Sequence, residues 1–238
     1  MNARTKRTLS AAAVIIMAAC MFFAAAAPSF AAKKKVYKIP YKLSYNNSNG
    51  SKYTQTFNIK SGRLSSVRYG GDYPSTVKLT YKSSSEIIMR FTDIDLDNTL
   101  TVKKNKVVER TGGNGVCKYY YYSNGRLRRA VIDNSTEEHG TNILQMNFYR
   151  DGKGEVKRKN EYLYDKPADE TLEPTEFNMT YTYKNTYKSG RLKTQKISYT
   201  VDDKKTTNTR TVSYKKLKMT KTQYKKYMNM WDLFNEVF

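Results

Sequence analysis

Alternation of apolar and polar residues, repeated along most of the chain, is the feature that most constrains its fold. Tyr, Ile, Leu, Met or Phe stands at every second position in residues 37–45, 144–148 and 177–183. A period of two is typical of antiparallel strands that bury one face and leave the other in water. We therefore predict a mainly β chain, an antiparallel meander or hairpin-repeat sheet that is either open or barrel-like.

A Gly-Arg-Leu turn recurs three times, in residues 61–64, 124–127 and 189–192. Glycine and the Ser or Asn before it tolerate the positive φ of short hairpins, and Leu starts the return strand facing the core. A polar loop follows each copy, at residues 70–75, 134–142 and 202–208. The spacing predicts a β-repeat domain of residues 32–219, made of three degenerate units of about 64 residues.

Residues 220–238 differ from the rest, because their apolar residues recur at helical rather than strand spacing. Thr220 and Gln223 have the spacing of a capping box. We predict one amphipathic helix whose apolar face packs on the sheet. Its polar face carries Lys225 and Asp232, among other residues. The alternative is a helix that lies on a membrane surface or binds a partner.

Residues 1–31 have the pattern of a cleaved export signal of the bacterial type. Arg4, Lys6 and Arg7 precede a long apolar run, and small residues allow cleavage after Ala31. A retained membrane anchor and a lipoprotein attached through Cys20 are the alternatives. The expected location is secreted or cell-surface. Only one cysteine then remains, so no disulfide within the chain is expected.

The chain is strongly basic, with 43 Lys and Arg against 21 Asp and Glu and a formal net charge of +22. The excess lies in residues 33–90 and 183–226, whereas residues 91–182 are nearly neutral. Such a charge indicates partners rather than a fold. Lysine outnumbers arginine, which favours diffuse attraction over bidentate recognition of one anion. The candidate anion-binding residues are Arg63, Arg126, Arg191, Lys38, Lys42, Lys184 and Lys193.

Residues 119–133 read Tyr-Tyr-Tyr-Tyr-Ser-Asn-Gly-Arg-Leu-Arg-Arg-Ala-Val-Ile-Asp. This segment resembles the YD-repeat (RHS-type) pattern, in which a tyrosine strand, an Asn/Asp-Gly-Arg-Leu turn and a return strand recur. Residues 57–69 and 183–199 are similar, although the spacing in that family is shorter and its Tyr-Asp pair is mostly missing here. The resemblance implies a β-hairpin repeat surface protein with a structural, shell-like or binding role.

No residue pattern indicates catalysis. His139 is the single histidine and stands in a polar stretch, and Cys117 is in a predicted strand outside any nucleophile motif. Asp93, Asp95 and Asp97 resemble the start of a calcium loop, but that template lacks its glycine and its bidentate glutamate here. We therefore predict a chain that is not an enzyme and holds no cofactor or metal.

These observations favour a secreted, non-enzymatic β-repeat protein that binds an anionic surface polymer or partner through a basic face. The expected partners are an anionic cell-wall polymer, an acidic glycan or an anionic membrane surface rather than nucleic acid. One alternative is a carrier or chaperone-like protein that holds an apolar ligand under the C-terminal helix. Another is a cell-wall or glycan hydrolase that uses carboxylates not identified by spacing.

Overall fold

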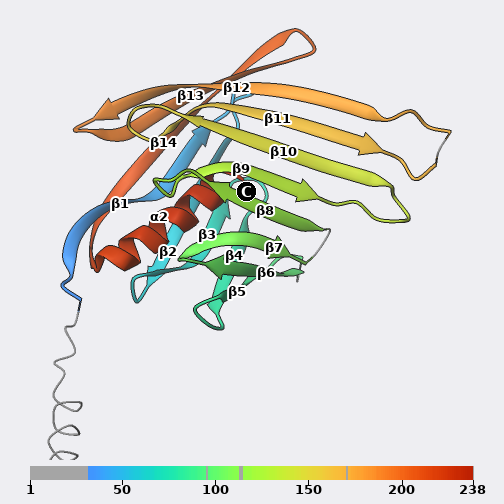
Figure 1. Ribbon diagram of the computed structural model, residues 1–238. Helices are drawn as coiled ribbons and strands as arrows, with labels where there is room; N and C mark the ends of the chain where they lie inside the picture. Colours follow the sequence, from blue (N-terminus) through green and yellow to red (C-terminus); the bar gives the residue numbers. More distant parts are fainter. Residues whose placement is uncertain (1–31, 95, 113–114, 170, 238) are drawn as a thin grey trace, which may run out of the picture. The chain divides into compact units, whose positions relative to one another are not determined.

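Figure 1 shows a computed structural model of the chain, which describes residues 32–94, 96–112, 115–169 and 171–237. The chain divides into two units, Met1–Lys34 and Lys35–Phe238. The second unit contains all the strands and the helix of the described residues. The predicted export signal, with Cys20, lies outside the described residues.

Within the described residues, strands β1 to β14 pair in chain order and close into an antiparallel barrel, because β1 also pairs with β14. This confirms the mainly β prediction and decides between its two forms. The strands are β1 (Lys35–Asn46), β2 (Lys52–Lys60), β3 (Arg63–Gly70), β4 (Ser75–Tyr81), β5 (Glu86–Phe91), β6 (Leu96–Lys103), β7 (Lys106–Thr111), β8 (Val116–Tyr121), β9 (Leu127–Asp133), β10 (Thr141–Arg150), β11 (Val156–Lys166), β12 (Thr175–Lys188), β13 (Arg191–Val201) and β14 (Lys204–Met219).

The apolar side of the alternating pattern faces the inside of the barrel. Ile39 and Leu43 of β1, Phe57 of β2 and Val67 of β3 are fully buried there. The residues between the inward-facing ones lie on the outer face of the barrel, where lysines such as Lys184 and Lys188 of β12 are exposed. Because the order closes, each of the fourteen described strands has a partner on both sides, which removes the main aggregation hazard of an open sheet.

Helix α2 (Lys221–Glu236) lies inside the barrel and contacts strands on several sides of it, namely β1, β3, β7 and β9. The predicted capping box is confirmed, since the Gln223 amide donates to the Thr220 hydroxyl and the Thr220 amide donates to the Gln223 side chain. The Tyr227 hydroxyl donates to the carbonyl of Pro40, which stands at a bulge of β1. Among the described residues, no helix combines the length and apolar character needed to span a membrane.

The Gly-Arg-Leu turns are hairpins at the end of the barrel from which α2 enters. They join β2 to β3, β8 to β9 and β12 to β13. Ser61 and Gly62 both have positive φ, at 51° and 75°, as a two-residue type I′ turn requires. A Cβ on Gly62 would also lie 2.4 Å from the side-chain nitrogen Nε2 of Gln223, so any other residue here would displace that side chain of the helix cap. Leu64, Leu127 and Leu192 are buried, as predicted.

Five hairpins at this end share two features, a bulge after the turn and a capped carbonyl, and only three of the five carry the Gly-Arg-Leu motif. The first buried residue after the turn is followed by a bulge, where one strand gains an extra residue. Each of these five buried residues has its carbonyl capped by a side chain of the neighbouring strand. The caps are Tyr81 to Leu64, Tyr121 to Val107, Arg150 to Leu127, Asn185 to Val156 and Tyr214 to Leu192.

The Tyr81 cap gives a direct test of this device. Tyr81→Phe removes the hydroxyl that donates to the Leu64 carbonyl at 2.9 Å and leaves that carbonyl without its partner. We expect the free energy of unfolding to fall by about 1–2 kcal/mol, measured by urea denaturation with an unchanged slope. Tyr73→Phe is the control, because Tyr73 is 93% exposed. Equal stability of the two variants would mean that the cap contributes nothing.

The predicted polar loop at residues 202–208 is wrong in extent. Asp202 and Asp203 alone form the turn, with positive φ at both, and β14 starts at Lys204. The polar run after Lys204 is strand because it pairs residue by residue with β13, from Lys204 opposite Val201 to Asn208 opposite Ile197. The division of the chain into three equal units stays a prediction.

Candidate functional site

Charged turns are segregated between the two ends of the barrel. In an antiparallel meander, successive turns alternate between the two ends of the barrel. All even-numbered strands therefore end at the same end, and α2 begins there because it follows β14. That end, here named the basic end, carries Lys60, Arg63, Lys82, Lys103, Lys104, Lys106, Arg126, Lys153, Lys188, Arg191 and Lys221 against Glu86, Asp151 and Glu155. The opposite, acidic end carries Asp72, Asp93, Asp133, Glu137, Glu138, Asp169, Glu173, Asp202 and Asp203 against Lys52, Lys166 and Lys204.

The structure brings together only some of the seven predicted anion-binding residues. Lys38, Arg191 and Lys193 line one cleft at the basic end. Arg63 lies at a separate pocket beside α2, and Arg126 is held in a buried ion cluster. Lys42 of β1 and Lys184 of β12 lie on strands of the wall, away from the turns.

The cleft, named here the cationic cleft, has a volume of about 370 Å³ and lies between β1, β13 and β14. Lys38, Lys188, Arg191 and Lys193 surround it, with the hydroxyl-bearing side chains of Ser189, Ser213 and Tyr214. All four cations are exposed, and among the described residues none of them forms a salt bridge. No acidic residue is among those that line the cleft, all of them described, so its field attracts anions.

Lys188 was not among the anion-binding residues predicted from the sequence, although its position before a Gly-Arg-Leu turn indicates that it lies beside Arg191. Lys188 immediately precedes the Ser189-Gly190 turn, and a two-residue hairpin pairs it directly with Arg191. The bulge that follows leaves Lys193 as the extra residue of β13. The turn and its bulge thus place three basic residues of one short segment around the cleft.

Arg126 is unavailable to an external anion because it is already paired. Its guanidinium lies 3.0 Å from Asp232 of α2 and 3.3 Å from Glu155. Arg150 lies 3.6 Å from the same Asp232 carboxylate, and its side chain is only 6% exposed. Burial raises the pKa of Glu155, and the Arg126 guanidinium opposes that shift. This buried ion cluster fixes the helix inside the barrel rather than binding a ligand.

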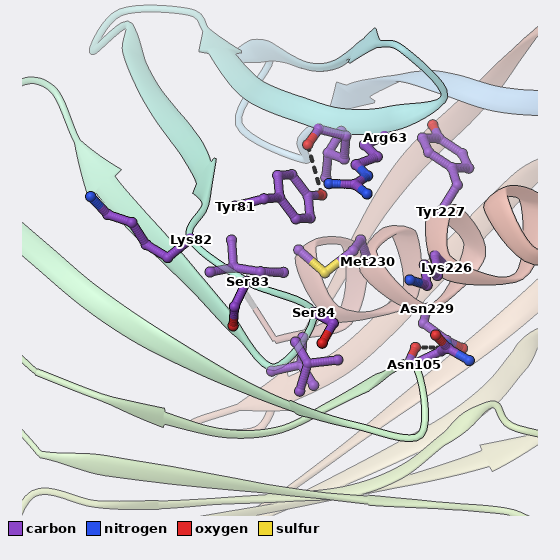
Figure 2. Close-up of a pocket in the computed structure, with 14 residues that line it drawn as sticks. Arg63, Tyr81, Lys82, Ser83, Ser84, Asn105, Lys226, Tyr227, Asn229 and Met230 are labelled. Atoms are coloured by element: carbon purple, nitrogen blue, oxygen red, sulfur yellow. Dashed lines mark hydrogen bonds between the residues drawn. The ribbon is translucent and has the colours of Figure 1, made fainter.

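A second cavity at the basic end, named the helix pocket, has a volume of about 260 Å³. It lies between α2 and strands β3 to β7, and Figure 2 shows Met230 and Tyr227 of the helix facing Tyr81 and Arg63 of the wall. The apolar residues that line it are Leu64, Ile87, Val102, Val107 and Met230. Arg63, Lys82, Ser83, Ser84, Asn105, Lys226 and Asn229 make up the polar part of its lining.

A third cavity, the tyrosine chamber, lies toward the acidic end and has a volume of about 420 Å³. Its floor is the last turn of α2, and its walls carry Tyr45, Tyr53, Tyr69, Tyr181, Tyr183 and Tyr199. Its charges are paired, with Lys159 2.6 Å from Glu161 and Arg210 3.2 Å from Glu236. Burial raises the pKa of Tyr69 to about 12, so its phenol stays neutral at neutral pH. The chamber therefore offers rings and hydroxyls rather than free charge.

Cys117, His139 and Asp97 lie in separate surroundings, and Asp95 is outside the described residues. Cys117 is fully buried in β8, and burial raises the pKa of its thiol. The His139 side chain is 76% exposed and its nearest acidic partner is Glu138, at 4.0 Å. Both carboxylate oxygens of Asp97 accept hydrogen bonds from Arg90, at 2.6 Å each. Within the described residues, no group of three or more His, Cys, Asp or Glu side chains is placed to hold a metal ion.

No family model matches the chain, and no curated protein matches it. Among solved structures, it is similar to a porin-like protein from Bacteroides uniformis, with 12% identity over 74% of this chain and 98% of that one and a TM-score of 0.44. A porin-like protein from Bacteroides vulgatus has 10% identity over 76% of this chain and 87% of that one, with a TM-score of 0.30. Likeness at this level identifies no function, and the resemblance to YD-repeat proteins stays a prediction.

Proposed function

We propose that this barrel is a non-enzymatic binding protein that attaches end-on to an anionic polymer outside the cytoplasm. The observation that carries the proposal is the segregation of charged turns, which makes one end basic and the other acidic. A body with such a charge distribution is oriented by the field of a polyanion, with its basic end toward the polymer. A flexible polymer with spaced negative charges suits a surface of separated lysines.

The cationic cleft is the proposed contact site within the basic end. It presents four unpaired cations and the hydroxyl groups of two serines, whereas Arg126 is paired within the buried ion cluster. Lysine predominates among these cations, which suits many weak contacts with a flexible chain better than bidentate recognition of one group. The wall itself is a poorer candidate, since its lysines alternate with threonines on the outer face, as on β12.

The test measures binding to poly(glycerol phosphate) across a salt series. The wild type is compared with a variant that removes the four cleft charges, Lys38→Gln, Lys188→Gln, Arg191→Gln and Lys193→Gln. Each phosphate contact to a single-stranded polyanion contributes about 0.7 to the slope of log Kd against log salt, so the loss of four contacts should lower the slope by about 3. Affinity at about 50 mM salt should fall by at least tenfold.

The matched control removes four exposed cations from the acidic end, with Lys52→Gln, Lys166→Gln, Lys204→Gln and Lys205→Gln. This variant has the same net charge as the cleft variant, and it should keep wild-type affinity within about twofold. Equal losses in both variants would show that net charge alone drives attachment. Absence of binding to the polymer at low salt would also overturn the proposal, and retention on heparin or acidic vesicles alone would redirect it to those surfaces.

A further inference from the structure

Three hydrogen-bonding side chains that line the helix pocket already have partners within the protein. The Tyr81 hydroxyl donates to the Leu64 carbonyl at 2.9 Å, as the dashed line in Figure 2 shows. The Tyr227 hydroxyl donates to Pro40, and the Asn229 amide donates to the Asn105 carbonyl at 2.9 Å. A ligand that lies against Tyr81, Tyr227 and the aliphatic residues of the lining therefore meets ring faces and aliphatic groups.

Two cations stand at the polar side of this pocket. The Arg63 guanidinium lies 5.2 Å from the centre of the Tyr81 ring, and this contact keeps the guanidinium beside the cavity. Lys226 of α2 also lines the cavity. Among the described residues, neither cation forms a salt bridge. Lys82 also lines the pocket, although Figure 2 shows its amino group pointing away from the other labelled side chains.

The apolar part of the pocket matches the acyl chain of an amphiphile, and the unpaired cations match an anionic head group. An acyl chain gains free energy when it leaves water for the space between Ile87, Val102 and Met230. An anionic head group gains charge-assisted hydrogen bonds from Arg63 and Lys226. The volume of about 260 Å³ is near the lower end of the usual range for ligand pockets, so it suits one chain rather than two.

We propose that the helix pocket binds a single-chain amphiphile with a carboxylate or phosphate head group. The acyl chain lies between α2 and strands β3 to β7, and the head group lies at Arg63 and Lys226. This site differs in position and chemistry from the cationic cleft, so the inference stands or falls separately from polymer binding. It also gives a specific form to the idea of a carrier that holds an apolar ligand beside its C-terminal helix.

The experiment titrates the full chain with four ligands of equal chain length by calorimetry, namely decanoate, decyl phosphate, decanol and decyltrimethylammonium. We expect the two anions to bind at least tenfold more tightly than decanol, because hydrogen bonds to charged groups are the stronger ones. The cationic amphiphile should bind most weakly. The ratio of decanoate to decyl phosphate affinity tells a free acid from a phosphate ligand. Failure of all four to bind, or equal affinity for the anionic and cationic ligands, would overturn the proposal.

Two variants separate the head group site from the acyl site. Arg63→Gln with Lys226→Gln should lower decanoate affinity about tenfold or more and leave decanol affinity unchanged. Lys60→Gln with Lys225→Gln is the matched control, since it removes two exposed cations that do not line the pocket, one from the β2–β3 hairpin that carries Arg63 and one from α2. Val102→Phe should weaken all ligands by filling the cavity, with circular dichroism to show that the barrel is intact. The variant that lacks the four charges of the cationic cleft should bind decanoate like the wild type. If its decanoate affinity fell as much as that of Arg63→Gln with Lys226→Gln, the assignment of the head group to Arg63 and Lys226 would be contradicted.

Discussion

Trp231→Ala is expected to lower the free energy of unfolding by about 3–5 kcal/mol, the range found when a large aromatic side chain is removed from a core. Trp231 is 4% exposed and stands in the half of α2 that is buried deepest in the barrel. Its ring lies 4.3 Å from that of Phe57 on β2, at 44°. The alanine variant leaves a cavity between helix and wall that the paired strands cannot close, because the hydrogen bonds of the closed barrel fix their positions.

The measurement is urea denaturation followed by circular dichroism, since the variant lacks the one tryptophan of the chain. Lys225→Ala is the control, because Lys225 lies on the same helix and is exposed. It should change stability by less than about 0.5 kcal/mol. Trp231→Phe, which keeps a ring beside Phe57, should lose less than the alanine variant. If Trp231→Ala and Lys225→Ala were equally stable, α2 would not be part of the cooperative core.

The walls of this barrel could be predicted from sequence because their signal is local. Each strand buries one face, so Ile39 and Leu43 on β1 repeat at a period of two, and the hairpins carry residues that tolerate positive φ. The capping box of α2 is equally local, since Thr220 and Gln223 are three residues apart. Closure is different, because β1 meets β14 across the whole length of the domain. Nothing in either strand alone shows which other strand it will pair with.

Charged residues inside the barrel were outside the reach of pattern analysis. Asp232 was expected on the polar side of the helix, whereas it is 1% exposed. A helix on an open sheet has a wet side, but a helix surrounded by a barrel does not, so its polar residues need partners from the wall. Arg210 likewise sits in a run of polar residues, yet it is buried against Gln195 and Glu236. Such pairs bring together positions far apart in the sequence.

The candidate site shows the same division between local and distant information. The repeat predicted equivalent positions for Arg63, Arg126 and Arg191, and all three do lie at turns of the basic end. Their surroundings differ because α2 contacts the three turns unequally. It reaches Arg126 with Asp232, it leaves Arg63 beside a pocket, and Arg191 lies in the cationic cleft. A motif thus predicted where these side chains start, and the helix decides what each of them contacts.

Asp232→Ala is the second change expected to have a large effect, with a loss of about 3–5 kcal/mol in the free energy of unfolding. The carboxylate lies 3.0 Å from Arg126 and 3.6 Å from Arg150. Removing it leaves Arg150 charged in a place where its side chain is 6% exposed. Arg126 keeps Glu155, at 3.3 Å, so the penalty falls mainly on Arg150. Urea denaturation of the variant and of the wild type gives the difference.

A double-mutant cycle, in which Asp232→Leu, Arg150→Met and the double variant are each compared with the wild type, tells a lost attraction from an uncompensated charge. Replacing a whole buried ion pair with apolar residues of similar volume is often neutral, whereas removing one partner is costly. Asp232→Leu alone should therefore be strongly destabilised, and adding Arg150→Met should restore part of the loss. The Leu127 and Gly154 carbonyls that Arg150 caps, each at 3.0 Å, would lose their donor in the double variant, so recovery should be incomplete. If the second change made the protein less stable still, the penalty would come from those carbonyls, and Arg150 would stabilise the barrel mainly through its hydrogen bonds within the wall rather than through its charge next to Asp232.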